Sequence, residues 1–194
     1  MSTTTTTTQK IDVRKITGLA LITAIVVVLQ ILTTVVAKAG MFTFTIALVP
    51  IVVGAAMYGW KAGAWLGLVF GALTLLDAGA FFALNIPGTI VTCLVKGTMA
   101  GLVAGAAYKL IEKKNKFIAV LVAAVAAPIM NTGFFILGCL VFFLDYVKSL
   151  AGDTNAFVFI LVGFVGINFF IELGVNLVLS PTIVKLIKLG KKSS

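Results

Sequence analysis

The residues best suited to chemistry in this sequence are polar side chains that stand within long apolar segments. Glu172 lies between Asn168 and Asn176, four residues from each, in an otherwise apolar and amidic run from residue 157 to residue 180. At helical spacing these three side chains share one face. A carboxyl group at membrane depth is costly, so it indicates a transport pathway, a ligand site or a buried polar pair. The structural alternative is a hydrogen bond to a neighbouring helix.

Lys96 and Asn131 are the polar residues near the middle of two other apolar segments. Counting inward at about 1.5 Å per residue puts both in one layer with Asn168 and Glu172. Either Lys96 and Glu172 neutralise one another, or one or both bind a polar ligand that enters from outside. Asn131 follows Pro128, so it either binds an amide, hydroxyl or heterocycle, or satisfies the carbonyl that the proline frees.

The sequence lacks the usual residues of a catalytic or metal site. It contains no histidine, and Cys93 and Cys139 stand in separate apolar segments. We find no close pair of carboxylates and no glycine-rich phosphate loop of the P-loop kind. We therefore predict that the chain is not an enzyme and holds neither a metal nor a cofactor.

The composition predicts an all-α integral membrane protein. Hydrophobic residues make up 61% of the 194 residues and charged residues 11%, and the mean hydropathy is +1.19. A helix needs roughly 20 residues to cross a hydrocarbon core of about 30 Å. Breaks at charged, glycine and proline residues delimit six apolar segments, namely 16–36, 44–58, 62–77, 86–108, 117–144 and 157–184. The second and third are short and are joined by the turn at 58–61, which is typical of a packed helical hairpin.

The basic residues indicate the orientation of these six predicted crossings. Most of them lie in the two terminal tails, in the turn at residue 61 and in the loop at 109–116, and the net charge is +9. Six crossings place all four stretches on one side, so the positive-inside rule predicts that both termini are cytoplasmic. Because the lysines flank apolar segments, we expect the lipid bilayer as their partner and no nucleic acid. We divide the chain into a disordered polar tail (1–12), a six-helix membrane domain (13–189) and a basic tail (190–194).

Small residues recur at every fourth position in three segments. Gly59, Gly63, Gly67 and Gly71 form one series and Gly97, Gly101 and Gly105 another, and both patterns predict close helix packing. Ala20 and Ala24 leave a shallow flat face on the first segment, which is either a docking face for another protein or a chance spacing. Phe82 and Asn85 precede Pro87 in an outer loop, where they either anchor the bilayer interface or cover an organic ligand.

The order of several short patterns resembles the substrate-binding S component of energy-coupling factor (ECF) transporters, which are bacterial vitamin importers. The patterns are Ala20-x-x-x-Ala24, Ile46 to Gly54 followed by Gly59-Trp-Lys61-Ala-Gly63, Pro87-Gly88-Thr89 with Lys96-Gly97, Pro128-x-x-Asn131, and Asn168-x-x-x-Glu172. They extend over nearly the whole chain.

The resemblance implies a multi-pass protein of the bacterial plasma membrane that binds a vitamin near its outer side. It implies partners as well: a membrane coupling protein, which would dock on Ala20 and Ala24, and two cytoplasmic ATPase subunits. The chain is most similar to the riboflavin and pantothenate branch, in which polar residues of the fifth and sixth helices hold the ligand. The riboflavin pattern has Lys three residues after Asn168, where this chain has Ile171. The substrate-binding residues that we predict are Asn131, Asn168, Glu172, Lys96, Asn85 and Phe82.

Two other functions are compatible with the residues. A proton-coupled secondary transporter would use Glu172 to carry the coupling proton, although no inverted repeat is visible. A structural membrane subunit would bind no ligand. Because the sequence has no nucleotide-binding motif, transport that consumes ATP requires another chain to hydrolyse it.

Overall fold

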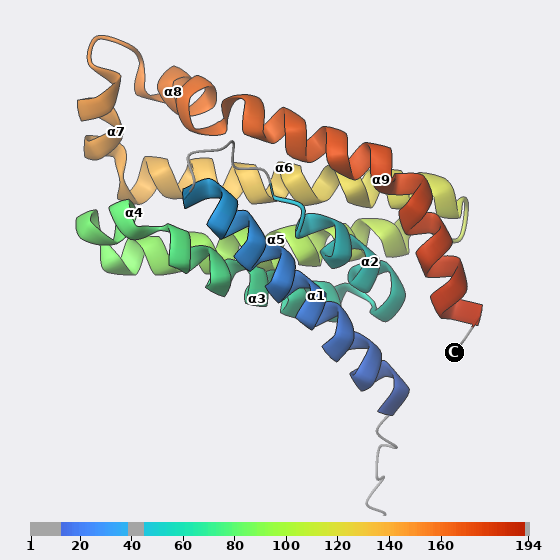
Figure 1. Ribbon diagram of the computed structural model, residues 1–194. Helices are drawn as coiled ribbons and strands as arrows, with labels where there is room; N and C mark the ends of the chain where they lie inside the picture. The colour runs from blue at the N-terminus through green and yellow to red at the C-terminus, as the bar shows by residue number, and fades with distance from the viewer. Residues whose placement is uncertain (1–12, 39–44, 193–194) are drawn as a thin grey trace, which may run out of the picture.

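A computed structural model describes residues 13–38 and 45–192 of the chain (Figure 1). Every regular element in these two ranges is a helix, which confirms the predicted all-α class. The longer helices are α1 (Val13–Lys38), α2 (Leu48–Tyr58), α3 (Trp60–Thr74), α5 (Ile86–Ile111), α6 (Lys116–Phe142) and α9 (Gly166–Lys192). The shorter elements are a 3-10 turn (Leu75–Asp77), α4 (Gly79–Leu84), α7 (Leu144–Ala151), α8 (Ala156–Phe159) and a π-helical segment (Ile160–Val165). The predicted tail 1–12 and the last two residues of the predicted tail 190–194 lie outside the described residues.

Helix length and composition identify a multi-pass membrane protein. Four of the described helices, α1, α5, α6 and α9, are long and apolar enough to cross a membrane. With 11 and 15 residues, α2 and α3 are shorter than the roughly 20 residues that a full crossing needs. The turn between them is at Gly59, whose φ of 92° suits glycine because it has no Cβ. The predicted short hairpin is therefore present, whereas the number of crossings stays a prediction.

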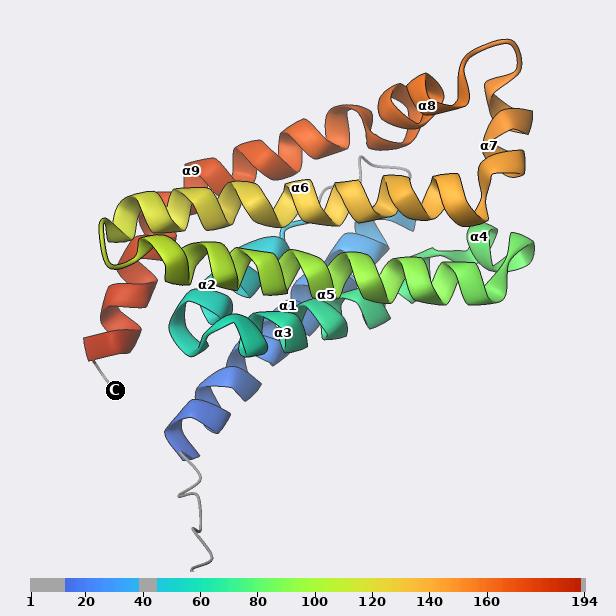
Figure 2. The same cartoon turned by 180° about the vertical axis from the view of Figure 1, so that it is seen from behind.

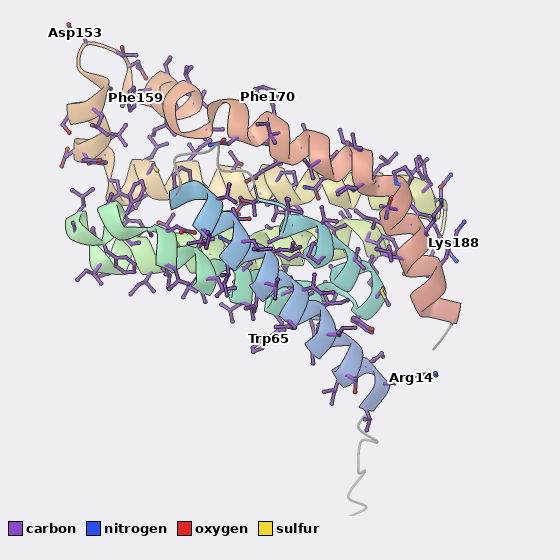
Figure 3. The ribbon with its side chains drawn as sticks, in the orientation of Figure 1. Arg14, Trp65, Asp153, Phe159, Phe170 and Lys188 are labelled. Carbon is purple, nitrogen blue, oxygen red and sulfur yellow. The ribbon has the colours of Figure 1, made fainter. Side chains whose placement is uncertain are left out.

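The basic stretches of the chain gather at one end of the bundle. The start of α1, the turn between α2 and α3, the loop between α5 and α6, and the end of α9 lie at this end in both views (Figures 1 and 2). Figure 3 shows Arg14 and Lys188 there and Asp153 at the opposite end, near α7. This arrangement agrees with the charge distribution that we used to orient the chain.

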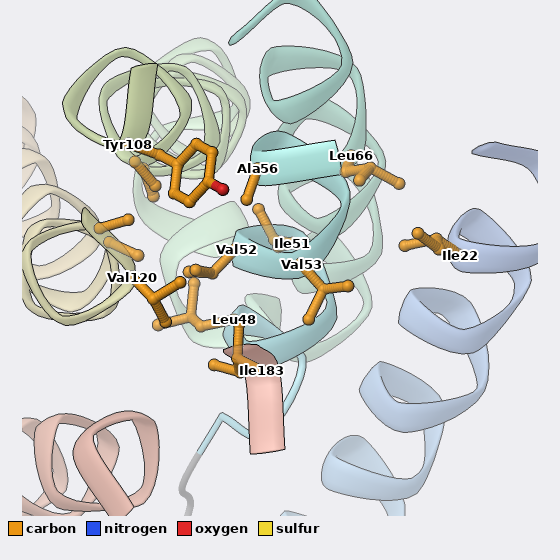
Figure 4. Packing of buried hydrophobic residues seen from close by; sticks show 14 of the residues in the cluster. Ile22, Leu48, Ile51, Val52, Val53, Ala56, Leu66, Tyr108, Val120 and Ile183 are labelled. Atoms are coloured by element: carbon orange, nitrogen blue, oxygen red, sulfur yellow. The ribbon is translucent and has the colours of Figure 1, made fainter. Parts of the chain in front are cut away.

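Helix α2 lies in the interior of the bundle rather than at its surface. Residues Leu48 and Pro50 to Ala56 are buried, so the helix is covered on nearly all sides. Figure 4 shows Leu48 and Val52 packed with Val120 of α6 and Ile183 of α9. The core therefore joins early and late parts of the chain.

The glycine series bring the backbones of α3 and α5 into direct contact, as predicted. A Cβ built on Gly67 would overlap the carbonyl oxygen of Gly97, and one on Gly101 would overlap that of Gly63. Because lipid provides little hydrophobic drive between helices, such backbone contact is a main source of packing energy. Lys96 immediately precedes Gly97, so this contact also sets the position of Lys96.

Candidate functional site

A polar cavity of about 180 Å³ lies between α5, α6 and α9. Its walls also include Val165 of the π-helical segment before α9, and Thr45, which precedes α2. The lining residues are Thr45, Lys96, Asn131, Thr132, Phe135, Val165, Asn168, Phe169 and Glu172. Four of the six predicted substrate-binding residues, Lys96, Asn131, Asn168 and Glu172, thus meet around one space.

Lys96 and Asn131 reach the cavity because they lie at matching depths on antiparallel neighbours. Lys96 is ten residues after Ile86, the first residue of α5, and Asn131 is eleven residues before Phe142, the last residue of α6. At 1.5 Å per residue these intervals correspond to about 15 and 16 Å. The predicted common layer is therefore present in the structure.

Glu172 is a buried carboxyl group with polar and basic neighbours in the cavity wall. Its side chain is 7% exposed. Hydrogen-bond donors of Thr45 and Asn131 are directed at the carboxylate, and the ammonium group of Lys96 attracts it across the cavity. A buried carboxylate is tolerated only when such groups compensate its lost hydration.

Lys96 is half-buried and lies beside an aromatic ring rather than on the carboxylate. Its Nζ is 5.4 Å from the ring centroid of Phe135, a distance typical of a cation–π contact. No N–O distance of 4.0 Å or less joins Lys96 to Glu172 among the described side chains. The two residues thus present opposite charges to one cavity without forming a contact ion pair.

Asn131 contributes an unpaired hydrogen-bond acceptor to the cavity wall. Its side chain is 7% exposed, and its Oδ1 atom has no hydrogen-bond partner among the described residues. The same holds for Oδ1 of Asn176 and Oε1 of Gln30, but of these three oxygens only that of Asn131 belongs to a residue of the cavity wall. An unsatisfied buried acceptor costs about 1–3 kcal/mol, so native proteins retain few of them. A hydrogen-bond donor on a bound molecule would satisfy this oxygen.

Asn176 belongs to the helix rather than to the cavity. It is fully buried, and its Nδ2 donates a hydrogen bond of 2.8 Å to the backbone oxygen of Glu172. Ser180 continues this pattern, because its Oγ donates to the backbone oxygen of Asn176 at 2.8 Å. The polar stripe seen in the sequence therefore divides into a cavity-facing part at Asn168 and Glu172 and a buried part below it.

The two predicted residues of the outer loop lie elsewhere. Asn85 caps the start of α5, where its Oδ1 accepts a hydrogen bond of 2.8 Å from the Gly88 backbone N–H. It lines a separate groove together with residues 140–146. Phe82 is half-buried on α4 and is not part of the cavity wall. The structure does not bring these two residues together with the other four.

Several wall residues were missed by the sequence reasoning. Phe135 follows Asn131 by four residues and Phe169 precedes Glu172 by three, so helical spacing from predicted residues is a signal that could have identified both aromatic residues. Thr45 carries no such signal, because it precedes α2 and reaches the cavity only through the path of the folded chain.

A second, apolar groove of about 570 Å³ runs along α1. Both Ala20 and Ala24 line it and are exposed, and Trp65 of α3, which is 51% exposed, forms its other wall. Figure 3 shows Trp65 beside α1. The small side chains of α1 thus leave an open apolar hollow that faces away from the core.

Comparison with known proteins gives one match. Residues 14–184 match the family described as ECF transporter, substrate-specific component. No curated protein matches the chain, and no solved structure matches it.

Proposed function

Because the chain belongs to the substrate-specific components of ECF transporters, we propose that it captures a vitamin or a related small molecule from outside the cell. It serves an ATP-driven importer in the bacterial plasma membrane. The observation that carries this proposal is the buried Oδ1 atom of Asn131, which lacks a partner among the described residues and lies in a wall shared with Lys96 and Glu172. A purely structural subunit has no use for such a cavity.

In this proposal the ligand contacts are Asn131, Asn168, Glu172 and Lys96. Carboxylate, amide and ammonium groups can orient a polar ligand, and the rings of Phe135 and Phe169 offer apolar surface beside them. Small-molecule sites typically combine a few polar groups of this kind with aromatic walls.

The energy for transport comes from partner chains. The sequence has no nucleotide-binding motif, so two cytoplasmic ATPase subunits hydrolyse ATP and a membrane coupling protein transmits the work. We assign the coupling protein to the groove at Ala20 and Ala24, because its exposed apolar walls suit a packed helix of another membrane protein.

The proposed topology has six crossings with both termini in the cytoplasm. It is supported by the basic residues gathered at one end of the bundle. It is also supported by the interior position of α2, because a short helix that longer helices cover can lie at membrane depth without lipid on all sides. With this orientation α4 and α7 face outward.

Ligand capture is tested by native mass spectrometry of the gently purified chain, in which we expect a retained small molecule. Uptake is then measured in vesicles that contain the chain with its coupling protein and ATPase subunits. We expect uptake to stop when the ATPase subunits carry an inactivating substitution. Uptake that persists without them and collapses with the pH gradient would instead establish a proton-coupled transporter that uses Glu172.

A further inference from the structure

The charge pattern of the cavity wall constrains the substrate more closely than the family does. Lys96 and Glu172 give the wall one basic and one acidic side chain, so its formal charge is zero when both are ionised. A ligand with a single charge would bring an unbalanced charge into this partly dehydrated space, which is unfavourable. A ligand that is neutral overall but carries both charges would satisfy both residues.

The hydrogen-bonding groups of the cavity wall that are still available determine how such a ligand is oriented. At one pole, the Oδ1 atom of Asn131 needs a donor, and the Glu172 carboxylate has acceptor capacity beyond the groups directed at it. An ammonium group or a protonated ring nitrogen supplies such donors. At the other pole, the Lys96 ammonium has only donors to offer and therefore suits a carboxylate or another acidic group.

The volume of the cavity limits the size of the ligand. At about 180 Å³ it is smaller than the roughly 300–1,000 Å³ of pockets for drug-sized ligands, but slightly larger than a cavity of about 150 Å³ that binds benzene. One ring, or an acyclic molecule of similar size, fits this space between Phe135 and Phe169. A three-ring flavin would extend beyond the enclosed part of the cavity.

We propose that the substrate is a compact zwitterion, with a basic nitrogen held by Asn131 and Glu172 and an acidic group held by Lys96. This inference rests on the proposed function, because it specifies the chemical class of the captured molecule.

The test uses the full-length chain in lipid nanodiscs and a mixture of six kinds of probe. The first three are matched: 4-(aminomethyl)benzoate is the zwitterion, 4-methylbenzoate the anion and 4-methylbenzylamine the cation. These are accompanied by acyclic amino acids, single-ring amino acids and riboflavin. Native mass spectrometry then reports which probes are retained. We expect retention from the zwitterionic classes, with the matched anion and cation at least tenfold weaker. Stronger retention of riboflavin or of a singly charged probe overturns the proposal.

Charge substitutions provide a second readout that does not depend on the amount of folded protein, because it is a ratio measured within one variant. Glu172→Gln should reduce the preference for the zwitterion over its matched anion by roughly 10- to 100-fold. Lys96→Gln should reduce the preference for the zwitterion over its matched cation by a similar factor. Lys96→Arg should keep the wild-type ratio. Unchanged ratios in both neutral variants contradict the assignment of the two poles.

Failure of this inference is distinguishable from failure of the proposed function. If the wild-type chain retains a molecule of another class, from the mixture or from a cell extract, ligand capture stands and only the zwitterion is wrong. If it retains no small molecule from either source, ligand capture itself is wrong.

Discussion

Asn131 of α6 and Glu172 of α9 face each other across one cavity, although 41 residues separate them in the sequence. The side chain of Asn131 directs a donor at the carboxylate, while its oxygen has no partner within the described part of the chain. One amide therefore directs a donor at the carboxyl group and keeps an acceptor open in the cavity wall.

Replacing Asn131 with Leu should remove ligand capture without unfolding the protein. The change deletes an unsatisfied acceptor, but it also removes the donor that Asn131 directs at Glu172, so we expect a moderate fall in the midpoint of thermal unfolding with the fold retained. Affinity for the retained ligand should fall roughly 10- to 100-fold, as measured by calorimetry. Asn176→Leu is the matched control, since Asn176 bonds within its own helix, and its affinity should equal that of wild type. Equal losses in both variants would assign Asn131 a structural role.

Gly97→Leu should separate α3 from α5. Even a Cβ at this position overlaps the Gly67 backbone oxygen, so a larger side chain forces the helices apart at a cost of roughly 1–3 kcal/mol or more. Thermal unfolding in detergent measures this loss, and ligand affinity should fall with it because Lys96 is adjacent. Gly174→Ala is the control, since nothing lies within 4 Å of a Cβ built there. Wild-type stability of the Gly97 variant would show that the two backbones are not in contact.

Ala20→Trp and Ala24→Trp should abolish uptake and leave ligand binding intact. The new side chain fills the apolar groove on α1, where we propose that the coupling protein docks, and this groove is remote from the polar cavity. Co-purification of the coupling protein measures docking, and native mass spectrometry measures ligand binding. Val35→Trp adds the same bulk to an exposed position of α1 outside the groove and should transport normally. Normal uptake by both alanine variants would disprove the docking assignment.

Substitutions at Asn85 test whether this residue caps a helix or contacts the substrate. Asn85→Ala should cost about 1 kcal/mol of stability because it removes the cap of α5, whereas Asn85→Ser retains an oxygen that can accept from the Gly88 N–H. If the role is capping, the serine variant recovers the unfolding midpoint and both variants bind ligand as wild type does. Reduced affinity in a stable serine variant would instead support a substrate contact.

Asp77→Ala should loosen the attachment of α1 to the end of α3. The Asp77 carboxylate accepts hydrogen bonds from Thr34 at 2.6 Å and from Gln30 at 3.4 Å, and both of these partners are buried on α1. We expect a loss of about 1 kcal/mol, since Asp77 itself is exposed and water screens part of the interaction. Hydrogen exchange of the α1 amides measures the loosening. The exposed Asp153 supplies the control variant, and equal exchange in Asp77→Ala and Asp153→Ala would rule out the attachment.

The sequence was sufficient for the helical class and for the chemistry of the site. The apolar segments, the polar residues within them and the glycine series follow from local spacing, because helical periodicity and the cost of a buried polar group act within one segment. Lys96, Asn131, Asn168 and Glu172 could be selected in this way, and matching depths along the helices correctly predicted that they share a layer.

Only the tertiary structure decided which of these groups meet and which atoms remain unsatisfied. Thr45 lines the cavity and Asn85 does not, because their positions depend on how distant helices pack. No local sequence pattern encodes this packing. The separation of Lys96 from Glu172 has the same origin. The sequence shows that an acidic and a basic residue stand within apolar segments, but their distance depends on how α5 and α9 pack in the folded chain. Residue type thus determined the chemistry of the candidate site, and packing determined its volume and its open acceptor.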